Sequence, residues 1–283
     1  MSSRFPPPLP PLNSAAILKS HGLRADKSLG QNFLQDPIAL QRIVDVAQVL
    51  PTDTVLEIGP GLGALTRHLA AAAGRVVAVE LDGRLIPALE ESVAGFSNIH
   101  IIEGDILNIE IAHILHTEAY LVVANIPYYI TSALLRHLLE STPRPRRMVL
   151  TVQKEVADRI CAGPGDMSLL ALSVQVYGQP QSIAKISAGA FHPAPNVDSA
   201  VVRIDLFREP LIPYDLLDAF FALAKSGFRQ KRKKLRNSLS TGAGKTNKKE
   251  IERVLTEVGI SPDRRAETLS LQEWQMLTAR MNT

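Results

Sequence analysis

The stretch VLEIGPGLGALT, residues 55–66, joins an apolar run to three closely spaced glycines. The apolar run predicts a buried strand, and a helix is expected directly after the glycines. Glycines at such a junction let the backbone approach a ligand, and the helix N-terminus offers unpaired N–H groups to it. With Gly59, Gly61 and Ala64 the loop fits G-x-G-x-x-G/A, a pattern that suits NAD as well as other adenosine-containing ligands. The stretch therefore predicts a nucleotide-binding α/β fold without specifying the ligand.

Short apolar runs recur along the first two thirds of the chain, separated by segments of helical length. They lie at 53–59, 74–82, 98–105, 119–127 and 146–153. Near-continuous apolar strands that alternate with helices predict a parallel sheet covered on both faces. Two further runs, 170–178 and 198–207, are predicted to be an antiparallel pair of strands that closes the sheet. An amphipathic pattern predicts a helix within 36–49.

The chain of 283 residues is expected to divide into three parts. Residues 1–25 form a proline-rich tail, whose first fourteen residues we expect to be extended and mobile. Residues 26–207 form the α/β domain. The pattern then becomes helical, so residues 208–283 are predicted to form a small all-helical domain, with helices at 214–228, 247–260 and 270–281.

Charge is unevenly distributed between the two ends of the chain. Residues 1–224 hold 17 Lys and Arg against 22 Asp and Glu, whereas residues 225–283 hold 14 against 6. The segment 225–249 alone carries ten basic residues and no acidic one. A solvated charge run is the ordinary interpretation, but the single sign favours a surface that binds a polyanion. The candidate phosphate-binding residues are Arg229, Lys231, Arg232, Lys233, Lys234 and Arg236, and Phe228 is expected to pack this segment onto its domain.

Composition excludes several other classes of protein. Apolar residues make up 46% of the chain, enough for a sizeable core, yet no apolar run approaches the roughly 20 residues of a membrane span. The N-terminus lacks the apolar segment of a secretory signal. Cys161 is the only cysteine and cannot form an internal disulfide, which favours a cytoplasmic location. No metal site is expected.

Acidic residues follow two of the predicted strands. Glu80 lies about twenty residues beyond the glycine loop, where a carboxylate can accept hydrogen bonds from ribose hydroxyls. Asp105 ends the next strand, where it can accept from the amino group of an adenine. Either residue alone would be an ordinary surface acid. Their shared position at strand carboxyl ends favours ligand binding.

The fourth strand ends in Asn125-Ile126-Pro127-Tyr128. One interpretation is a simple strand-to-loop turn, which Asn and Pro both favour. The other is chemical: the amino nitrogen of adenine is a poor nucleophile, and two acceptors placed at its N–H groups would favour attack. The side-chain oxygen of Asn125 and the carbonyl of Ile126 are the candidate acceptors, Pro127 fixes their backbone, and Tyr128 offers a flat face to an extruded base. An electrophilic methyl on a sulfonium completes such a site and selects S-adenosylmethionine over NAD.

Further motifs extend across most of the chain: KSLGQNFLQD at 27–36, QKEVADRI at 153–160, FHPAPNVDSAVVRI at 191–204 and FRQKRKKLRNSL at 228–239. With the glycine loop and NIPYYIT, they closely resemble the ribosomal RNA adenine dimethylase family from about residue 26 to about residue 275. The resemblance implies a Rossmann-like, seven-stranded methyltransferase domain with S-adenosylmethionine as donor. It also implies N6,N6-dimethylation of two adjacent adenosines near the 3′ end of small-subunit (16S) ribosomal RNA. The expected partner is the precursor of the small ribosomal subunit, and the expected state is a monomer.

The resemblance also assigns residues. It implies that the cofactor is contacted by Asn32, Leu34, Gly59, Gly61, Glu80, Asp105, Ile106 and Asn125. The acceptor site is expected to comprise Asn125, Ile126, Pro127 and Tyr128. Phe191 is expected to supply a second aromatic face, with an ordinary core Phe as the alternative, and His192 is expected to be structural.

Three alternatives remain at this point. Relatives in the same family methylate large-subunit RNA and confer macrolide resistance, and some members act as non-catalytic assembly factors. DNA adenine methyltransferases typically carry Pro where this chain has Ile126. The chain also departs from many relatives at residues 161–169, where a Lys/Tyr-Gly pair is missing, so any substrate contact of this loop is left open.

Overall fold

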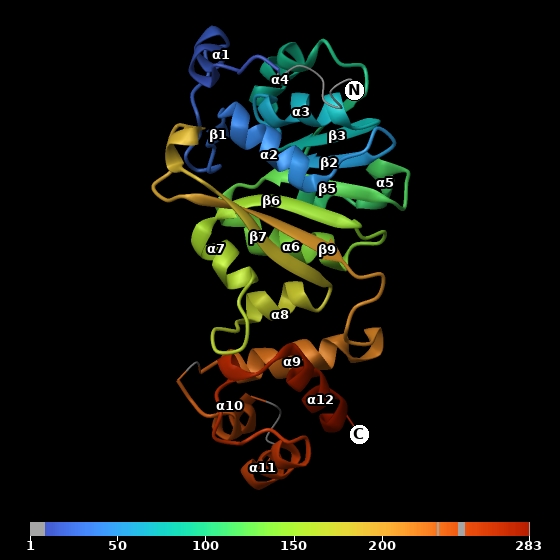
Figure 1. Ribbon diagram of the computed structural model, residues 1–283, viewed down its shortest axis with the longest axis vertical. Helices are drawn as coiled ribbons and strands as arrows, with labels where there is room; N and C mark the ends of the chain where they lie inside the picture. The colour runs from blue at the N-terminus through green and yellow to red at the C-terminus, as the bar shows by residue number, and fades with distance from the viewer. Residues whose placement is uncertain (1–8, 231, 243–246, 283) are drawn as a thin grey trace, which may run out of the picture. The chain divides into compact units, whose positions relative to one another are not determined.

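The computed structural model describes residues 9–230, 232–242 and 247–282. Its centre is a seven-stranded sheet with the strand order β4-β3-β2-β5-β6-β9-β7 (Figure 1). The strands are β2 (Thr54–Ile58), β3 (Arg75–Glu80), β4 (Ile99–Glu103), β5 (Tyr120–Asn125), β6 (Arg147–Gln153), β7 (Gly178–Ile186) and β9 (Ser199–Leu206). A separate two-stranded sheet joins β1 (Phe33–Leu34) to β8 (Phe191–His192). The expected seven-stranded α/β sheet is confirmed.

Strand pairing places the ligand-binding edge of the sheet. β2 pairs in parallel with β3 on one side and with β5 on the other, and β4 and β6 continue the parallel arrangement outward. The chain therefore leaves β2 in one direction and returns to its other side at β5. In open α/β sheets a ligand binds at such a switch point, beside the carboxyl ends of the strands. β9, which covers the predicted strand at 198–207, runs antiparallel to β6.

Helices α2 (Pro37–Ala47) and α3 (Ala64–Ala72) bury one face of the sheet. Asp36 starts α2 because its side chain accepts hydrogen bonds from the backbone N–H groups of Ile38 and Ala39. The core under these helices includes Leu40, Ile43, Val44, Leu65, Leu69, Val55, Val76, Leu121, Val123 and Val149. Alternate strand residues, such as Leu56 and Val122, are fully buried on the opposite face. Burial on both faces explains the near-continuous apolar runs.

The remaining helices occupy the crossovers and the C-terminal region (Figure 1). They are α1 (Ser14–Ser20), α4 (Ile86–Val93), α5 (Ile111–Leu115), α6 (Thr131–Glu140), α7 (Lys154–Ile160), α8 (Leu169–Gln175), α9 (Leu217–Phe228), α10 (Leu235–Gly242), α11 (Lys248–Glu257) and α12 (Leu271–Met281). Within the described residues, no helix is both long and apolar enough to cross a bilayer.

The chain forms two compact units. The first combines the chain up to Ala157 with Gln181–Leu206, and the second combines Asp158–Pro180 with Phe207–Thr283. The chain changes from the first unit to the second between Leu206 and Phe207, and residues 158–180 belong to the same unit as the C-terminal helices. Backbone hydrogen bonds hold them there, because the N–H groups of Gly165 and Met167 both donate to the carbonyl of Glu267.

One prediction of local structure is wrong. Residues 170–178 were expected to form a strand, but most of them form α8, which Ser168 caps by accepting a hydrogen bond from the N–H of Ala171. A short apolar run has no clear period, so a helix and a strand cannot be distinguished by pattern alone. The second half of the proline-rich tail contains α1, whose Leu18 is buried in a cluster with Phe33 and Leu62, whereas residues 1–8 of the stretch expected to be extended lie outside the described residues.

The helical unit is built around Trp274, which is fully buried. The ring of Phe228 stacks on it, with centroids 5.8 Å apart and an interplanar angle of 28°. This contact confirms that Phe228 packs the basic segment onto its domain. Gly227 makes the approach possible, since a Cβ at this position would lie 2.5 Å from the Trp274 ring.

Candidate functional site

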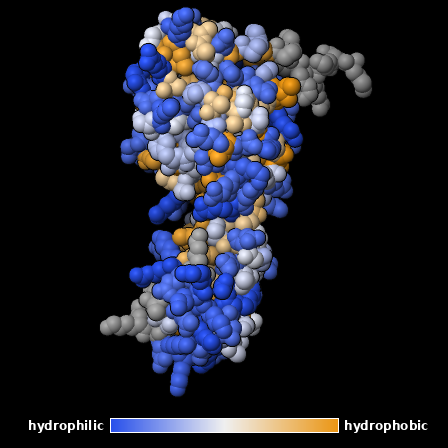
Figure 2. All heavy atoms as spheres, turned by 90° about the vertical axis from the view of Figure 1, so that its left-hand side faces the viewer, coloured by the Kyte–Doolittle hydropathy of each residue, from blue (hydrophilic) through white to orange (hydrophobic). Residues whose placement is uncertain are grey.

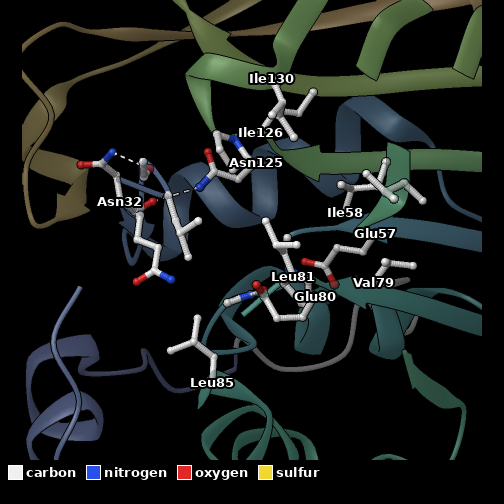
Figure 3. A pocket seen from close by; sticks show the side chains of 18 of the residues that line it. Asn32, Glu57, Ile58, Val79, Glu80, Leu81, Leu85, Asn125, Ile126 and Ile130 are labelled. Carbon is white, nitrogen blue, oxygen red and sulfur yellow. Dashed lines mark hydrogen bonds between the residues drawn. The ribbon is translucent and has the colours of Figure 1, made fainter. Parts of the chain in front are cut away.

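A cavity of about 360 Å³ lies at the carboxyl ends of β2, β3 and β5. This volume falls within the range of small-molecule sites, roughly 300–1,000 Å³. Its walls contain every predicted cofactor and acceptor residue except Phe191: Asn32, Leu34, Gly59, Gly61, Glu80, Asp105, Ile106, Asn125, Ile126, Pro127 and Tyr128. The structure therefore brings together side chains that are almost a hundred positions apart in the sequence (Figure 3).

The glycine loop forms the floor of the cavity between β2 and α3. Gly59 and Gly61 have φ angles of +68° and +58°, a region that favours glycine. A Cβ at Gly61 would also lie 2.9 Å from the ring of Phe33. The N–H of Gly61 donates to Oε2 of Glu80 at 2.9 Å, so the loop is fixed to the end of the neighbouring strand.

Both predicted acids, Glu80 and Asp105, line the cavity, and each has oxygen lone pairs left for a ligand. Glu80 is buried, and its second oxygen accepts a hydrogen bond from the N–H of Asp82 at 2.9 Å. Burial raises the pKa of Glu80, and the backbone hydrogen bonds from Asp82 and Gly61 offset part of that rise. Asp105 accepts from the N–H of Leu107 at 3.0 Å. Because a carboxylate has about four acceptor positions, each acid can still accept a hydrogen bond from a ligand.

Glu57 is a cavity residue to which the sequence analysis assigned no role. It lies inside β2, is 1% exposed, and burial raises the pKa of its carboxyl to about 8. The hydroxyl of the neighbouring Thr66 offsets part of this rise in pKa. Within the described chain, however, Oε2 of Glu57 and Oγ1 of Thr66 have no hydrogen bond of normal geometry. Figure 3 shows Glu57 close to Glu80. An acid inside an otherwise apolar strand was the signal that could have identified it.

The amide of Asn125 has a defined orientation. Its Nδ2 donates to the backbone carbonyl of Asn32 at 3.1 Å (Figure 3), and a carbonyl can only accept. Oδ1 of Asn125 is therefore the atom left for a ligand. The N–H of Ile126 donates to the carbonyl of Thr151 at 3.2 Å, which fixes the peptide that follows Asn125.

Two tyrosines continue the cavity wall. Tyr128 is partly buried, and its hydroxyl lies 2.9 Å from Oγ of Ser199. Burial raises the pKa of Tyr128, so its phenol is neutral at physiological pH. Tyr129 is 56% exposed at the mouth of the cavity and was not among the predicted site residues. Its ring lies against Gly30, where an added Cβ would be 3.4 Å from it.

Phe191 does not join this group of residues. Strand β8 pairs with β1 so that Phe191 lies opposite Leu34, and both are buried in the core beneath α2 and α3. Phe191 is only 3% exposed and does not line the cavity. The structure therefore places it as a core residue, and a role in stacking on a base stays a prediction. His192 is partly exposed.

A strap of residues 26–34 covers one side of the cavity. Nε2 of Gln31 donates to Oδ2 of Asp82 at 2.8 Å, and the guanidinium of Arg84 bonds both Asp82 and Asp26. The Arg84 guanidinium holds the pKa of Asp82 below its usual range, despite its burial. These bonds tie the strap to the loop that follows β3.

The candidate phosphate-binding residues of the helical unit differ in their partners. Lys234 pairs with Asp263 at 3.2 Å, and Arg236 pairs with Asp263 at 2.9 Å and with Glu252 at 3.6 Å. Arg229, Arg232 and Lys233 are exposed, and no ion pair to them occurs within the described ranges. Lys231 lies outside these ranges. On the face turned to the viewer in Figure 2, the C-terminal helical unit is mostly hydrophilic.

Comparison with known protein families and sequences covers most of the chain. The model of the family "Ribosomal RNA adenine dimethylase" matches residues 22–276. A ribosomal RNA small subunit methyltransferase A of Dehalococcoides mccartyi is 47% identical over 262 residues, which cover 92% of this chain and 90% of the relative. A protein of the same name from Geobacillus kaustophilus is 42% identical over 277 residues, or 95% and 94% of the two chains.

Solved structures also resemble this chain in fold and in sequence. The dimethyladenosine transferase of Plasmodium falciparum superposes with a TM-score of 0.76 at 26% identity, covering 88% of this chain and 97% of that one. The 23S rRNA methyltransferase ErmE superposes with a TM-score of 0.73 at 30% identity, covering 89% and 100%. On the strength of the family model and these relatives, the chain belongs to the ribosomal RNA adenine dimethylase family.

Proposed function

We propose that this protein uses S-adenosylmethionine to dimethylate N6 of two adjacent adenosines near the 3′ end of small-subunit ribosomal RNA. Family membership supports the chemistry, and the names of the relatives at 42% and 47% identity support the choice of RNA. The observation that carries the proposal is the hydrogen bond from Nδ2 of Asn125 to the carbonyl of Asn32, which leaves the amide oxygen of Asn125 for a ligand.

The donor side of the cavity fits S-adenosylmethionine. Glu80 accepts hydrogen bonds from the ribose hydroxyls, Asp105 accepts one from the adenine amino group, and Leu34 and Ile106 supply apolar walls. Oε2 of Glu57, which has no hydrogen bond of normal geometry within the described chain, fits a positively charged ligand, because a nearby cation stabilises a buried carboxylate. When bound, the cofactor supplies an electrophilic methyl group.

The acceptor side holds an adenine amino group. Oδ1 of Asn125 and the carbonyl of Ile126 accept hydrogen bonds from the two N6 hydrogens, which draws the nitrogen lone pair out of conjugation with the ring. Pro127 limits the backbone freedom of these acceptors, and Tyr128 stacks on the base. No side chain is needed as a base, because the methylated nitrogen is cationic and loses its proton readily to water.

The helical unit supplies contacts to the RNA backbone. Arg229, Arg232 and Lys233 bind phosphates, since their charges are exposed and not held in ion pairs within the described chain. Lys234 and Arg236 contribute less, because they are already held by Asp263. The proposed partner is the precursor of the small subunit, which places the protein in the cytoplasm.

Methylation of large-subunit RNA is the competing function, because the structure of ErmE is similar at 30% identity. The small-subunit assignment is favoured by the higher identity of relatives named for that RNA, which also cover at least nine tenths of both chains.

Mass spectrometry of ribosomal RNA from cells that lack this protein tests the proposal. We expect small-subunit RNA to lose its two dimethyladenosines, and a gene copy for the wild-type protein to restore them. A copy with Asn125→Ala should not restore them, because loss of a preorganised hydrogen bond at the reacting atom typically costs about a hundredfold or more in rate. Retention of both modified bases in the deleted strain, or their loss from large-subunit RNA instead, would refute the assignment.

A further inference from the structure

A pair of hydroxyl groups joins the acceptor loop to a strand on the far side of β6. The hydroxyl of Tyr128 lies 2.9 Å from Oγ of Ser199. Tyr128 follows the end of β5, whereas Ser199 is the first residue of β9 and lies opposite Gln153, the last residue of β6. The contact therefore forms at the edge of the sheet where the cavity lies.

The surroundings make this contact difficult to replace. Ser199 is fully buried, so a water molecule cannot replace Tyr128 as the hydrogen-bond partner of its hydroxyl. A buried hydroxyl that loses its partner incurs its full desolvation cost. Tyr128 is thus held at its backbone, whose carbonyl accepts a hydrogen bond from the Thr131 hydroxyl at 3.2 Å, and at the far end of its side chain. Together these contacts fix where the long axis of the ring lies.

We propose that Ser199 is a positioning residue for methyl transfer. It holds the ring of Tyr128 at the place where the target adenine stacks, and so brings N6 of that base to Oδ1 of Asn125. This role rests on the proposed function, because it requires a base in the acceptor site. Orientation of the reacting groups is a large part of catalysis, and small displacements lower the rate without loss of binding.

Two substitutions remove the same hydrogen bond from opposite sides. Ser199→Ala and Tyr128→Phe should each lower kcat on small-subunit substrate about tenfold and leave KM for S-adenosylmethionine within about twofold. The double variant should be no slower than either single variant, because only one bond is lost. Ser199→Thr should recover most of kcat, because it keeps the hydroxyl and suits a strand.

The first unit contains a matched control. Tyr120 also donates a hydrogen bond through its hydroxyl, to the carbonyl of Pro143 at 3.1 Å, and the hydroxyl of Ser141 bonds the same carbonyl at 3.1 Å. Tyr120 is the first residue of β5, so it lies at the opposite edge of the sheet from Asn125. Tyr120→Phe and Ser141→Ala should lower the melting temperature about as much as the test variants do, with kcat unchanged.

The outcomes separate this role from the proposed function. A wild-type protein without activity on small-subunit RNA would overturn both. An active wild type with unaffected Ser199→Ala would overturn the positioning role alone, and so would additive effects in the double variant. Equal losses of kcat in the control variants would show that the effect is only one of stability, and would overturn it as well.

Discussion

Protonation of Glu57 gives the sharpest test of how the cavity binds its ligand. Burial raises the pKa of this carboxyl from 4.5 to about 8, so at pH 7 it carries a proton in roughly nine molecules of ten. Ionising it at pH 7 costs only about 1 kcal/mol, because pH 7 lies about one unit below this pKa. A cation that enters the cavity can supply this amount, because charges a few ångströms apart attract by several kcal/mol at an effective dielectric constant near 20.

We therefore expect S-adenosylmethionine to release a proton when it binds. The release should be about 0.9 protons per molecule at pH 7, about 0.5 at pH 8 and about 0.1 at pH 9. Isothermal titration in buffers of different ionisation enthalpy measures this number directly. Glu57→Gln keeps the shape of the side chain but cannot titrate, so it should release almost none. Any proton release that remains in this variant would come from Glu80, whose pKa is also raised by burial.

The same carboxyl should affect stability. Between pH 4.5 and about 8 the unfolded chain has lost this proton while the folded protein keeps it. The free energy of unfolding therefore falls as pH rises, by up to about 3 kcal/mol between pH 5.5 and 7.5, and Glu57→Gln should remove this decline. Urea unfolding at the two pH values checks it. Equal proton release by wild type and variant, together with equal pH dependence of stability, would contradict the raised pKa.

Two further predictions concern the strap and the basic segment. Arg84→Ala removes the ion pair with Asp26 and should speed release of S-adenosylmethionine about two- to fivefold in stopped-flow measurements, a modest effect because the pair is exposed. An unchanged release rate would show that the strap does not retain the cofactor. Changing Arg232 and Lys233 to Gln should flatten the plot of log RNA affinity against log salt by about 1.4 to 1.8, whereas Lys234→Gln should change it less. Equal slopes for the double variant and wild type would exclude these two residues as phosphate contacts.

The fold was predictable where a pattern repeats. The five parallel strands follow from runs of β-branched and apolar residues between helix-length segments, since burial on both faces leaves few polar positions. Helix α8 was missed because its apolar run is too short to show a period. The assignment of residues 158–180 to the helical unit depends on hydrogen bonds to Glu267, about a hundred positions away, which no local pattern reveals.

The grouping of strand-end residues around the cavity was predictable, but their contacts were not. Residues at the carboxyl ends of parallel strands must meet, so Gly59, Glu80 and Asn125 could be grouped from strand positions alone. The bond between Tyr128 and Ser199 could not, because it crosses from one strand end to the start of another 71 positions away. No pattern in the sequence indicated that Lys234 forms an ion pair with Asp263.

The hydrogen bond from Asn125 to Asn32 links the two halves of the cavity. Asn32 belongs to the strap that covers the donor side, and its carbonyl sets which atom of the Asn125 amide faces the acceptor side. Any movement of the strap therefore changes the orientation of the acceptor amide. The ion pair of Arg84 with Asp26 restrains the strap. Under the proposed function, this one short segment of chain should therefore affect both donor binding and acceptor alignment.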